Sequence, residues 1–267
     1  MSVYVCFRFH EASLDNRKSA FQEYVIATAA LVSKIPPNIT FEQAGAVSLC
    51  LATATIPLYS KQPIGLGFQA PWDGGRGTYE GQPIFVIGGA SSVGQYVIQF
   101  ARLSGFSPIL TTASSHNHSL LKSLGATHVL DRNLTFSDIS EEISKIIDAP
   151  LKVIYDAVMT PATSQGGYDI LSAGGHIVTA LGAAIKTQEG DDKNIVGVFG
   201  DFHAPQNFAL GTVIVSHLTK LLADGDIVPN AVEVVTGGFN GVVNGIDRLR
   251  KREVSAKKLI IRPQDTV

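Results

Sequence analysis

The clearest chemical pattern in the chain is a turn rich in glycine and serine, residues 88–94, which follows a short apolar run at residues 85–87. A turn of this kind, placed between a strand and an amphipathic helix, lets backbone N–H groups at the helix start approach a phosphate closely. The usual fingerprint has three glycines spaced Gly-x-Gly-x-x-Gly. Here Gly89 and Gly94 hold the outer places and Ser91 takes the middle one. The pattern predicts a nucleotide-binding protein, and the alternative is a strand-to-helix turn that binds nothing.

The end of the next apolar run bears on which nucleotide would bind. An NAD site usually has Asp or Glu there, about 20 residues further on, to hold the ribose 2′-hydroxyl. Here residues 111–117 read Thr-Thr-Ala-Ser-Ser-His-Asn, and no acidic residue occurs from Gly81 to Leu130. A carboxylate would repel a 2′-phosphate, whereas hydroxyl, imidazole and amide groups can hydrogen-bond to it. The pattern favours NADP over NAD. A second and compatible interpretation is that Ser114 and Ser115 cap the helix that follows.

The elements that would position these residues alternate along the middle of the chain. Short apolar runs typical of strands lie at residues 84–88, 108–112, 128–131, 153–157, 176–181 and 195–199. Helix-like runs lie between several of them. Val93, Val97 and Phe100 recur at helical spacing, and Gly125 is placed to end a second helix. Apolar strands that alternate with helices predict a parallel sheet covered on both faces. The expected fold class is α/β, with a doubly wound parallel sheet.

The two ends of the chain have a different pattern. A loop rich in Gly and Pro occupies residues 61–82, before the alternating region. Before that loop, strand-like runs lie at residues 1–9 and 21–26. After Asp201 the sequence predicts, in order, a helix at 207–222, a strand at 231–235, a helix at 241–249 and a strand at 258–262.

Composition limits the classes of function. With 45% hydrophobic and 16% charged residues among 267, the chain can bury a sizeable core. A net charge of −2 and the lack of a basic run disfavour nucleic acid or an anionic membrane as partner. No apolar run reaches the roughly 18 residues of a membrane span. Cys6 and Cys50 have no close partner in the sequence, which predicts a reducing, cytoplasmic compartment.

Other catalytic motifs have little support. His116 and His118 lie close together without a cysteine nearby, so no metal site is expected. The sequence contains neither a Gly-x-Ser-x-Gly elbow nor a Gly-Lys-Ser/Thr phosphate loop, which argues against hydrolase and ATPase functions. Neither Tyr155 nor Tyr168 is followed by a lysine four residues later, so a short-chain dehydrogenase is rejected.

Four blocks of sequence, in family-like order and spacing, resemble the medium-chain dehydrogenase/reductase superfamily. The blocks are residues 20–24 with 34–36, residues 88–94, residues 124–129 and residues 254–259. Within the superfamily, the chain looks most like the zinc-free quinone and enoyl reductases and the fungal trans-enoyl reductases that partner polyketide synthases. Jointly the blocks are specific, although each one alone is not.

The resemblance implies a Rossmann domain and a GroES-like catalytic domain built from both chain ends. It divides the chain into a remnant of the catalytic domain at residues 1–48, an NADP-binding Rossmann domain at 49–200 and a return to the catalytic domain at 201–267. Members of this branch use NADPH to reduce an activated carbon–carbon double bond in an enone, quinone or enoyl thioester, by hydride transfer without a metal. A polyketide synthase partner and a homodimer are further expectations.

The resemblance also assigns residues to sites, although it assigns no catalytic residue and no proton donor. The cofactor phosphates would meet Gly88, Gly89, Ser91, Ser92, Val93 and Gly94. The rest of the cofactor would meet Ser114, Ser115, His116, Asn117, Arg132, Leu181, Gly182, Val254 and Ser255. The substrate would meet Leu51, Ala52, Thr53, Ala54, Thr55, Gly200, Asp201 and Phe202. Among these Thr53 is the candidate nearest the nicotinamide, and the alternative is a threonine on a helix surface.

The N-terminal part departs from the family pattern. Relatives have a long stretch before the block that begins here near Phe21, and this chain has only residues 1–19 in its place. A GroES-like domain without those strands is expected to be incomplete and to have open sheet edges. The alternative function is therefore a non-catalytic NADPH-binding remnant, or a fragment that needs a partner or the missing segment.

Overall fold

The chain divides into two structural units in the computed structural model, which describes residues 3–5, 16–18 and 20–267. The sheet unit is Thr53–Phe199. The terminal unit joins Met1–Ala52 to Gly200–Val267. Among the described residues, no helix has both the length and the apolar character needed to cross a membrane.

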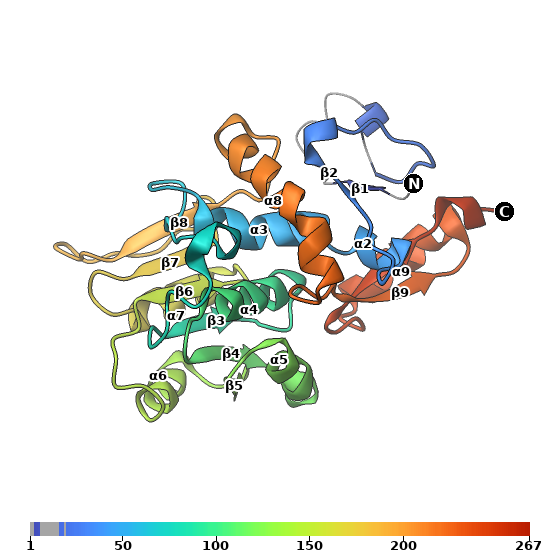
Figure 1. The fold of residues 1–267 in the computed structure, drawn as a ribbon. Helices are drawn as coiled ribbons and strands as arrows, with labels where there is room; N and C mark the ends of the chain where they lie inside the picture. The colour runs from blue at the N-terminus through green and yellow to red at the C-terminus, as the bar shows by residue number, and fades with distance from the viewer. Residues whose placement is uncertain (1–2, 6–15, 19) are drawn as a thin grey trace. The chain divides into compact units, whose positions relative to one another are not determined.

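The sheet unit is built on six parallel strands, which lie one beside another in Figure 1. Their spatial order is β5 (His128–Asp131), β4 (Ile109–Ala113), β3 (Ile84–Ile87), β6 (Val153–Asp156), β7 (His176–Ala180) and β8 (Asn194–Val198). Every residue of β3, β4 and β6 is buried, as expected for central strands of a covered parallel sheet. The strand order reverses between β3 and β6, which is the topological switch point of a doubly wound sheet. The predicted fold class is confirmed.

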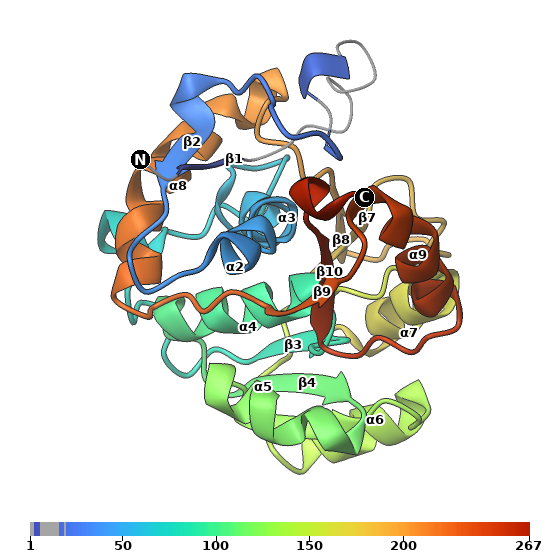
Figure 2. The same cartoon turned by 90° about the vertical axis from the view of Figure 1, so that its right-hand side faces the viewer.

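Helices cover the sheet in two pairs. α4 (Ser92–Ser104) contacts α5 (His118–Leu124), and α6 (Phe136–Ser144) contacts α7 (Pro161–Ile170). Figure 2 shows α4 running along β3. The core on the α6 and α7 side is mostly aliphatic, and Ile139, Ile143 and Ile154 are buried in it. Gly125 ends α5, as the sequence predicts.

Residues 61–82 form an irregular segment that is anchored by aromatic side chains. It follows α3 (Ser48–Tyr59) and contains one wide turn, Pro71–Gly75. Trp72 packs edge-to-face against Tyr59, with ring centroids 5.2 Å apart, and against Phe100 of α4 at 6.2 Å. Aromatic contacts of this kind stabilise beyond the area that they bury. The loop is therefore irregular in backbone, as predicted, yet held firmly against the sheet unit.

The terminal unit brings together segments from both ends of the chain. Its N-terminal part contains β1 (Val3–Val5), β2 (Val32–Lys34) and α2 (Phe41–Gly45), with short 3-10 turns at Asn16–Lys18 and Ala29–Leu31. Its C-terminal part contains α8 (Pro205–Ala223), β9 (Ala231–Val235), α9 (Val242–Arg250) and β10 (Lys257–Ile261), with 3-10 turns at Gly238–Gly241 and Pro263–Asp265. β1 pairs with β2 in antiparallel fashion, and β9 pairs with β10 in parallel. Figure 2 shows α9 beside these two parallel strands.

Polar contacts tie the two ends to each other. The Ser33 hydroxyl lies 2.9 Å from the Thr219 hydroxyl of α8, and the Asn38 amide donates to the Leu222 carbonyl at 3.1 Å. Arg262, after β10, donates to the Glu42 carboxylate of α2 at 2.8 Å. Residues that are about 180 to 220 positions apart in sequence therefore fold as one unit, as a domain made from both chain ends requires.

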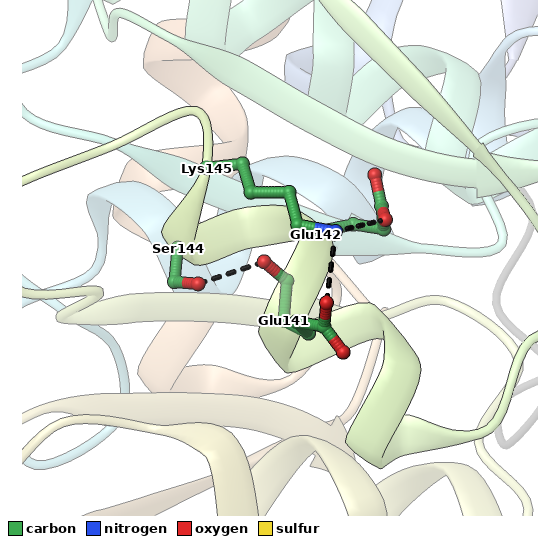
Figure 3. Close-up of polar contacts among 4 residues, drawn as sticks. All are labelled: Glu141, Glu142, Ser144 and Lys145. Atoms are coloured by element: carbon green, nitrogen blue, oxygen red, sulfur yellow. Dashed lines mark hydrogen bonds and ion pairs between the residues drawn. The ribbon is translucent and has the colours of Figure 1, made fainter.

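The outer face of α6 shows how exposed charges are arranged on the sheet unit (Figure 3). Lys145 Nζ lies 2.9 Å from Glu141 Oε1 and 2.9 Å from Glu142 Oε1. The hydrogen bonds with Glu141 and Glu142 raise the pKa of Lys145. All three side chains are solvent-exposed, so the cluster contributes little to folding stability.

Strand boundaries in the sheet unit fall within about one residue of the predicted ones, within the usual variation of assigned ends. One strand prediction is wrong. Residues 21–24 form bends and residues 25–26 are irregular. Phe21 has a positive φ of 60°, which is not strand backbone, and none of these residues pairs with a strand in the described part of the chain. Residues 1–2 and 6–9 of the predicted first strand lie outside the described residues, and Val3–Val5 is a strand.

Candidate functional site

The glycine turn at the end of β3 is shaped by three close approaches. Gly88 has φ 78°, which favours glycine, and a Cβ added to it would overlap Cγ2 of Val158. A Cβ on Gly89 would overlap the Thr111 hydroxyl. A Cβ on Gly94 would overlap the Gly88 carbonyl oxygen, so the first turn of α4 lies directly against the end of β3. Such backbone proximity leaves space for a phosphate at the helix start.

Ser91 has a definite role in this turn. It is the N-cap of α4, and its hydroxyl accepts a hydrogen bond from the Gly94 N–H at 3.0 Å. The Ser91 N–H donates in turn to the Gly88 carbonyl at 3.0 Å. The other N–H groups of the first helical turn have no acceptor within the helix, and the helix dipole places partial positive charge there. The serine in the middle glycine place therefore caps a helix start whose free N–H groups and partial positive charge suit an anion.

Two threonines of β4 support the turn from below, which the sequence alone did not reveal. The Thr112 hydroxyl accepts from the Gly88 N–H at 2.9 Å, and the Thr112 carbonyl accepts from the Gly89 N–H at 3.1 Å. The Thr111 hydroxyl donates to the Val86 carbonyl at 2.7 Å. Both side chains are buried. Two threonines near the end of the strand that follows the glycine turn in sequence are a signal that could indicate this supporting role.

The residues expected around the adenosine phosphate lie at the neighbouring ends of β4 and β5. Ser114 is half-buried, Ser115 and His116 are exposed, and Asn117 is buried. Ser115–Asn117 forms a short 3-10 turn whose N-cap, Ser114, makes no side-chain capping hydrogen bond. Arg132 is exposed and donates its backbone N–H to the Ala113 carbonyl at 3.2 Å. Residues with hydroxyl, imidazole and guanidinium side chains therefore follow two neighbouring strands at one corner of the sheet.

Leu181 and Gly182 follow β7 on the other side of the switch point. Leu181 is 68% exposed and Gly182 has φ 79° with open space around its Cα. An exposed leucine at the carboxyl end of a buried strand is available to an apolar part of a ligand.

The loop after β6 was not singled out from the sequence, yet it adjoins the glycine turn. Asp156 is fully buried at the end of β6. Its Oδ1 accepts from the backbone N–H groups of Val158, at 3.0 Å, and Met159, at 2.9 Å. Its Oδ2 accepts from the hydroxyls of Thr163, at 2.9 Å, and Ser164, at 2.8 Å. Four donors thus satisfy a buried carboxylate, as such a group requires.

The predicted substrate residues differ in exposure. Leu51, Ala52, Ala54 and Thr55 are buried in α3, and Thr53 is the one of the five that is partly exposed. The Thr53 carbonyl accepts from the buried Tyr155 hydroxyl at 2.7 Å, which fixes this turn of α3 to β6.

The remaining candidates belong to the terminal unit. Asp201 and Phe202 are buried, and Gly200 is half-buried. Phe202 packs on α8, where a Cβ on Gly211 would come within 2.6 Å of the Phe202 Cβ. Val254 is half-buried and Ser255 is exposed.

Within the described residues, no three His, Cys, Asp or Glu side chains come together in a way that could hold a metal ion. The donor set that a zinc ion needs is therefore not found among these side chains.

A covered parallel sheet with a glycine turn and a capped helix at its switch point defines the Rossmann class of α/β proteins. Residues 92–199 match the family model described as "Zinc-binding dehydrogenase". A trans-enoyl reductase of Gibberella fujikuroi is 30% identical over 92% of this chain and 73% of its own length. The trans-enoyl reductase fsa3 of a Fusarium species is 29% identical over 92% and 72%. The chain belongs to the medium-chain dehydrogenase/reductase superfamily, beside the fungal trans-enoyl reductases, which confirms the predicted family.

Solved structures share the fold. The apo JamJ enoyl reductase superposes with a TM-score of 0.67 at 16% identity, over 88% of this chain and 66% of that one. A mycobacterial protein complexed with NADPH superposes with a TM-score of 0.67 at 18% identity, over 87% and 68%. At such identities the likeness is one of fold.

Proposed function

We propose that the chain is an NADPH-dependent oxidoreductase that reduces an activated carbon–carbon double bond by hydride transfer without a metal. The observation that carries the proposal is the close packing of the glycine turn at the switch point. Gly88, Gly89 and Gly94 are packed so closely that no side chain fits, and Ser91 caps the helix start beside them. Relatives named trans-enoyl reductases support the type of reaction.

The proposed cofactor contacts follow the geometry of the sheet. The turn at residues 88–94 would contact the pyrophosphate, and the N–H groups of Ser92 and Val93, which have no acceptor within the helix, would donate to it. Ser114, Ser115, His116 and Asn117, with Arg132, would surround the adenosine 2′-phosphate, because guanidinium and hydroxyl groups are suitable donors to phosphate. Asp131, next to Arg132, accepts from the Asn133 N–H at 2.9 Å. Leu181 and Gly182, with Val254 and Ser255, would lie near the nicotinamide.

NADPH, when bound, supplies the hydride that goes to the β-carbon of an enone, quinone or enoyl thioester. The chain's own residues would hold the cofactor and the substrate in position, and hydrogen-bond donors would polarise the substrate carbonyl. Thr53, partly exposed on α3, is the proposed residue nearest the reacting atoms. We assign no proton donor.

The domain organisation is part of the proposal. Residues 49–200 would be the NADP-binding domain, and residues 1–48 with 201–267 would be the GroES-like part that completes the substrate site. A cytoplasmic location, a polyketide synthase partner and a homodimer complete the proposal.

A second candidate is a non-catalytic NADPH-binding protein, or a fragment that needs a partner or a further segment for turnover. It is kept because the chain spans 73% of the length of the Gibberella relative. The two candidates share the cofactor site and differ only in catalysis.

Fluorescence titration with NADPH and NADH tests the shared part, and NADPH oxidation with enones, enoyl thioesters and quinones separates the candidates. Tighter binding of NADPH with turnover supports the reductase. Binding without turnover on any substrate supports the second candidate, and binding of neither nucleotide contradicts both.

A further inference from the structure

The loop after β6 has features that its sequence does not explain on its own. Met159 adopts a positive φ of 59°, a backbone conformation that costs free energy for a residue other than glycine. Asp156 compensates by accepting hydrogen bonds from two successive N–H groups, those of Val158 and Met159. The loop is thus held in one strained conformation by a buried carboxylate.

The conformation places an apolar side chain on the glycine turn. Val158 is 45% exposed although it is a valine, and its Cγ2 would overlap a Cβ added to Gly88. β6 is also hydrogen-bonded to β3 here, because Ala157 donates its N–H to the Ile87 carbonyl at 3.0 Å. Gly88 and Val158 therefore form the two sides of the switch point, where ligands of doubly wound sheets bind.

The Asp156 carboxylate is also linked to β7 through one intervening hydroxyl group, that of Ser164. Ser164, which donates to Asp156 Oδ2, has its hydroxyl 2.6 Å from that of Thr179 on β7. Thr179 is fully buried and lies two residues before Leu181. One hydrogen-bonded network thus links the loop that carries Val158 to β7, the strand that Leu181 follows.

We propose that Val158 is a nucleotide-contacting residue that lies against the phosphates and the adjoining ribose, and that Asp156 is the positioning residue that holds Val158 there. The proposal rests on the proposed function, since the ligand is the dinucleotide. Val158 supplies an apolar wall that shields the phosphates from water on the side opposite the N–H groups of α4. Asp156 does not touch the ligand and acts through the backbone of residues 157–159.

A near-isosteric pair of variants tests the position of Val158. Val158→Asn and Val158→Asp have almost the same shape and differ by one negative charge. If phosphates lie beside this side chain, Val158→Asp should raise the Kd for NADPH at least tenfold more than Val158→Asn. The difference in Kd between the two variants should become smaller in 1 M salt, because the Debye length falls to about 3 Å there. Val213, which is 44% exposed on α8, gives the matched control, and Val213→Asp should bind NADPH as Val213→Asn does.

Conservative replacement tests the positioning role of Asp156. Asp156→Asn keeps the oxygen that accepts from Val158 and Met159, and it should bind NADPH within about threefold of the wild type. Asp156→Ala removes both acceptors and should raise the Kd at least tenfold. Thermal melting is measured for each variant, because a purely structural role would lower the melting temperature without changing the Kd of the folded protein. If Asp156→Ala does not fold, the Kd values of Val158→Asp and Val158→Asn still show whether the side chain of residue 158 lies beside the phosphates.

The outcomes separate this inference from the proposed function. Wild-type binding of NADPH with equal Kd values for Val158→Asp and Val158→Asn overturns the inference and leaves the proposed function standing. Wild-type binding of neither nucleotide overturns both. A salt-dependent gap at residue 158, absent at residue 213, supports the inference.

Discussion

Arg132 donates its backbone N–H to the carbonyl oxygen of Ala113 at 3.2 Å, so the residue after β5 is fixed beside the end of β4. The exposed guanidinium group therefore starts from the same corner as Ser114 and Ser115. The adenosine 2′-phosphate of a bound NADPH would lie at this corner, whereas NADH has no 2′-phosphate. This relationship makes nucleotide preference the most direct test of the site.

Replacement of Arg132 by alanine should weaken NADPH binding selectively. Hydrogen bonds to charged groups contribute about 1.5–3 kcal/mol each, so the Kd for NADPH should rise about tenfold or more. The Kd for NADH should change less than twofold, since it lacks the phosphate. Isothermal titration with both nucleotides measures the two effects.

Lys145→Ala is the control for that substitution, because Lys145 is exposed on α6 and already paired with Glu141 and Glu142 (Figure 3). It should leave both affinities unchanged. Equal losses for NADPH and NADH in Arg132→Ala would place the guanidinium elsewhere than at the 2′-phosphate.

A pair of helical glycines should respond to alanine in opposite directions. Gly94→Ala would push a Cβ into the Gly88 carbonyl, and overpacking of this kind destabilises by about 1–3 kcal/mol. Gly245 lies in α9, where the nearest atoms to an added Cβ are 3.7 Å away. Gly245→Ala should therefore stabilise by about 0.5–1 kcal/mol through helix propensity. Urea denaturation measures both, and a stabilising Gly94→Ala would contradict the close approach of α4 to β3.

The ion pairs around Glu233 should make the terminal unit sensitive to acid. Arg248 Nη1 lies 2.6 Å from Glu233 Oε1, and Lys257 donates to Oε2 at 2.8 Å. The hydrogen bond from Arg248, and then that from Lys257, lowers the pKa of Glu233 from 4.5 to about 2. Because the folded-state pKa is the lower one, the stabilisation is complete above pH 4.5 and is lost as the pH falls through about 2.

Glu233→Gln measures that contribution. The variant should unfold at a lower urea concentration than the wild type near neutral pH, and the difference should shrink as the pH approaches the folded-state pKa. Arg248→Met removes one partner of Glu233, so this variant should lose stability at a higher pH than the wild type does as the pH is lowered. A gap between wild type and Glu233→Gln that stays constant with pH would show that ionisation of Glu233 is not the cause.

The predictions from sequence succeeded where one local signal determines the structure. Alternating apolar runs located all six strands of the sheet, and Ser91 was recognised in the turn because Gly89 and Gly94 hold the outer places of the fingerprint. The residues missed act through hydrogen bonds that the apolar pattern does not reveal. Thr112 lies inside an apolar strand, and only the parallel register of β3 and β4 brings it beside Gly88. Asp156 ends an apolar strand, and its buried carboxylate holds the loop at Val158 that follows it in the chain. Residues 21–26 failed because apolar character there is not matched by a pairing strand.

One tyrosine anchors the loop between β7 and β8. The Tyr168 hydroxyl donates to Asp191 Oδ2 at 2.7 Å, and Lys193 Nζ donates to the Tyr168 carbonyl at 3.0 Å and lies 4.9 Å from the centre of its ring. Burial, and then the Asp191 carboxylate, raises the pKa of Tyr168 to about 12. The phenol therefore remains a hydrogen-bond donor throughout the neutral and moderately alkaline range.

Tyr168→Phe removes that donor and keeps the ring. The free energy of unfolding should fall by about 1 kcal/mol or somewhat more, since the bond lost is to a charged group. Amide hydrogen exchange across residues 183–193 should become faster, because the loop loses one of its attachments. Tyr59→Phe is the matched control: it removes another buried hydroxyl, which lies 2.8 Å from Ser104, and should leave exchange in this loop unchanged. Unaltered exchange in Tyr168→Phe would mean that Gln165, which accepts from the Lys186 N–H at 2.8 Å, is sufficient to hold the loop.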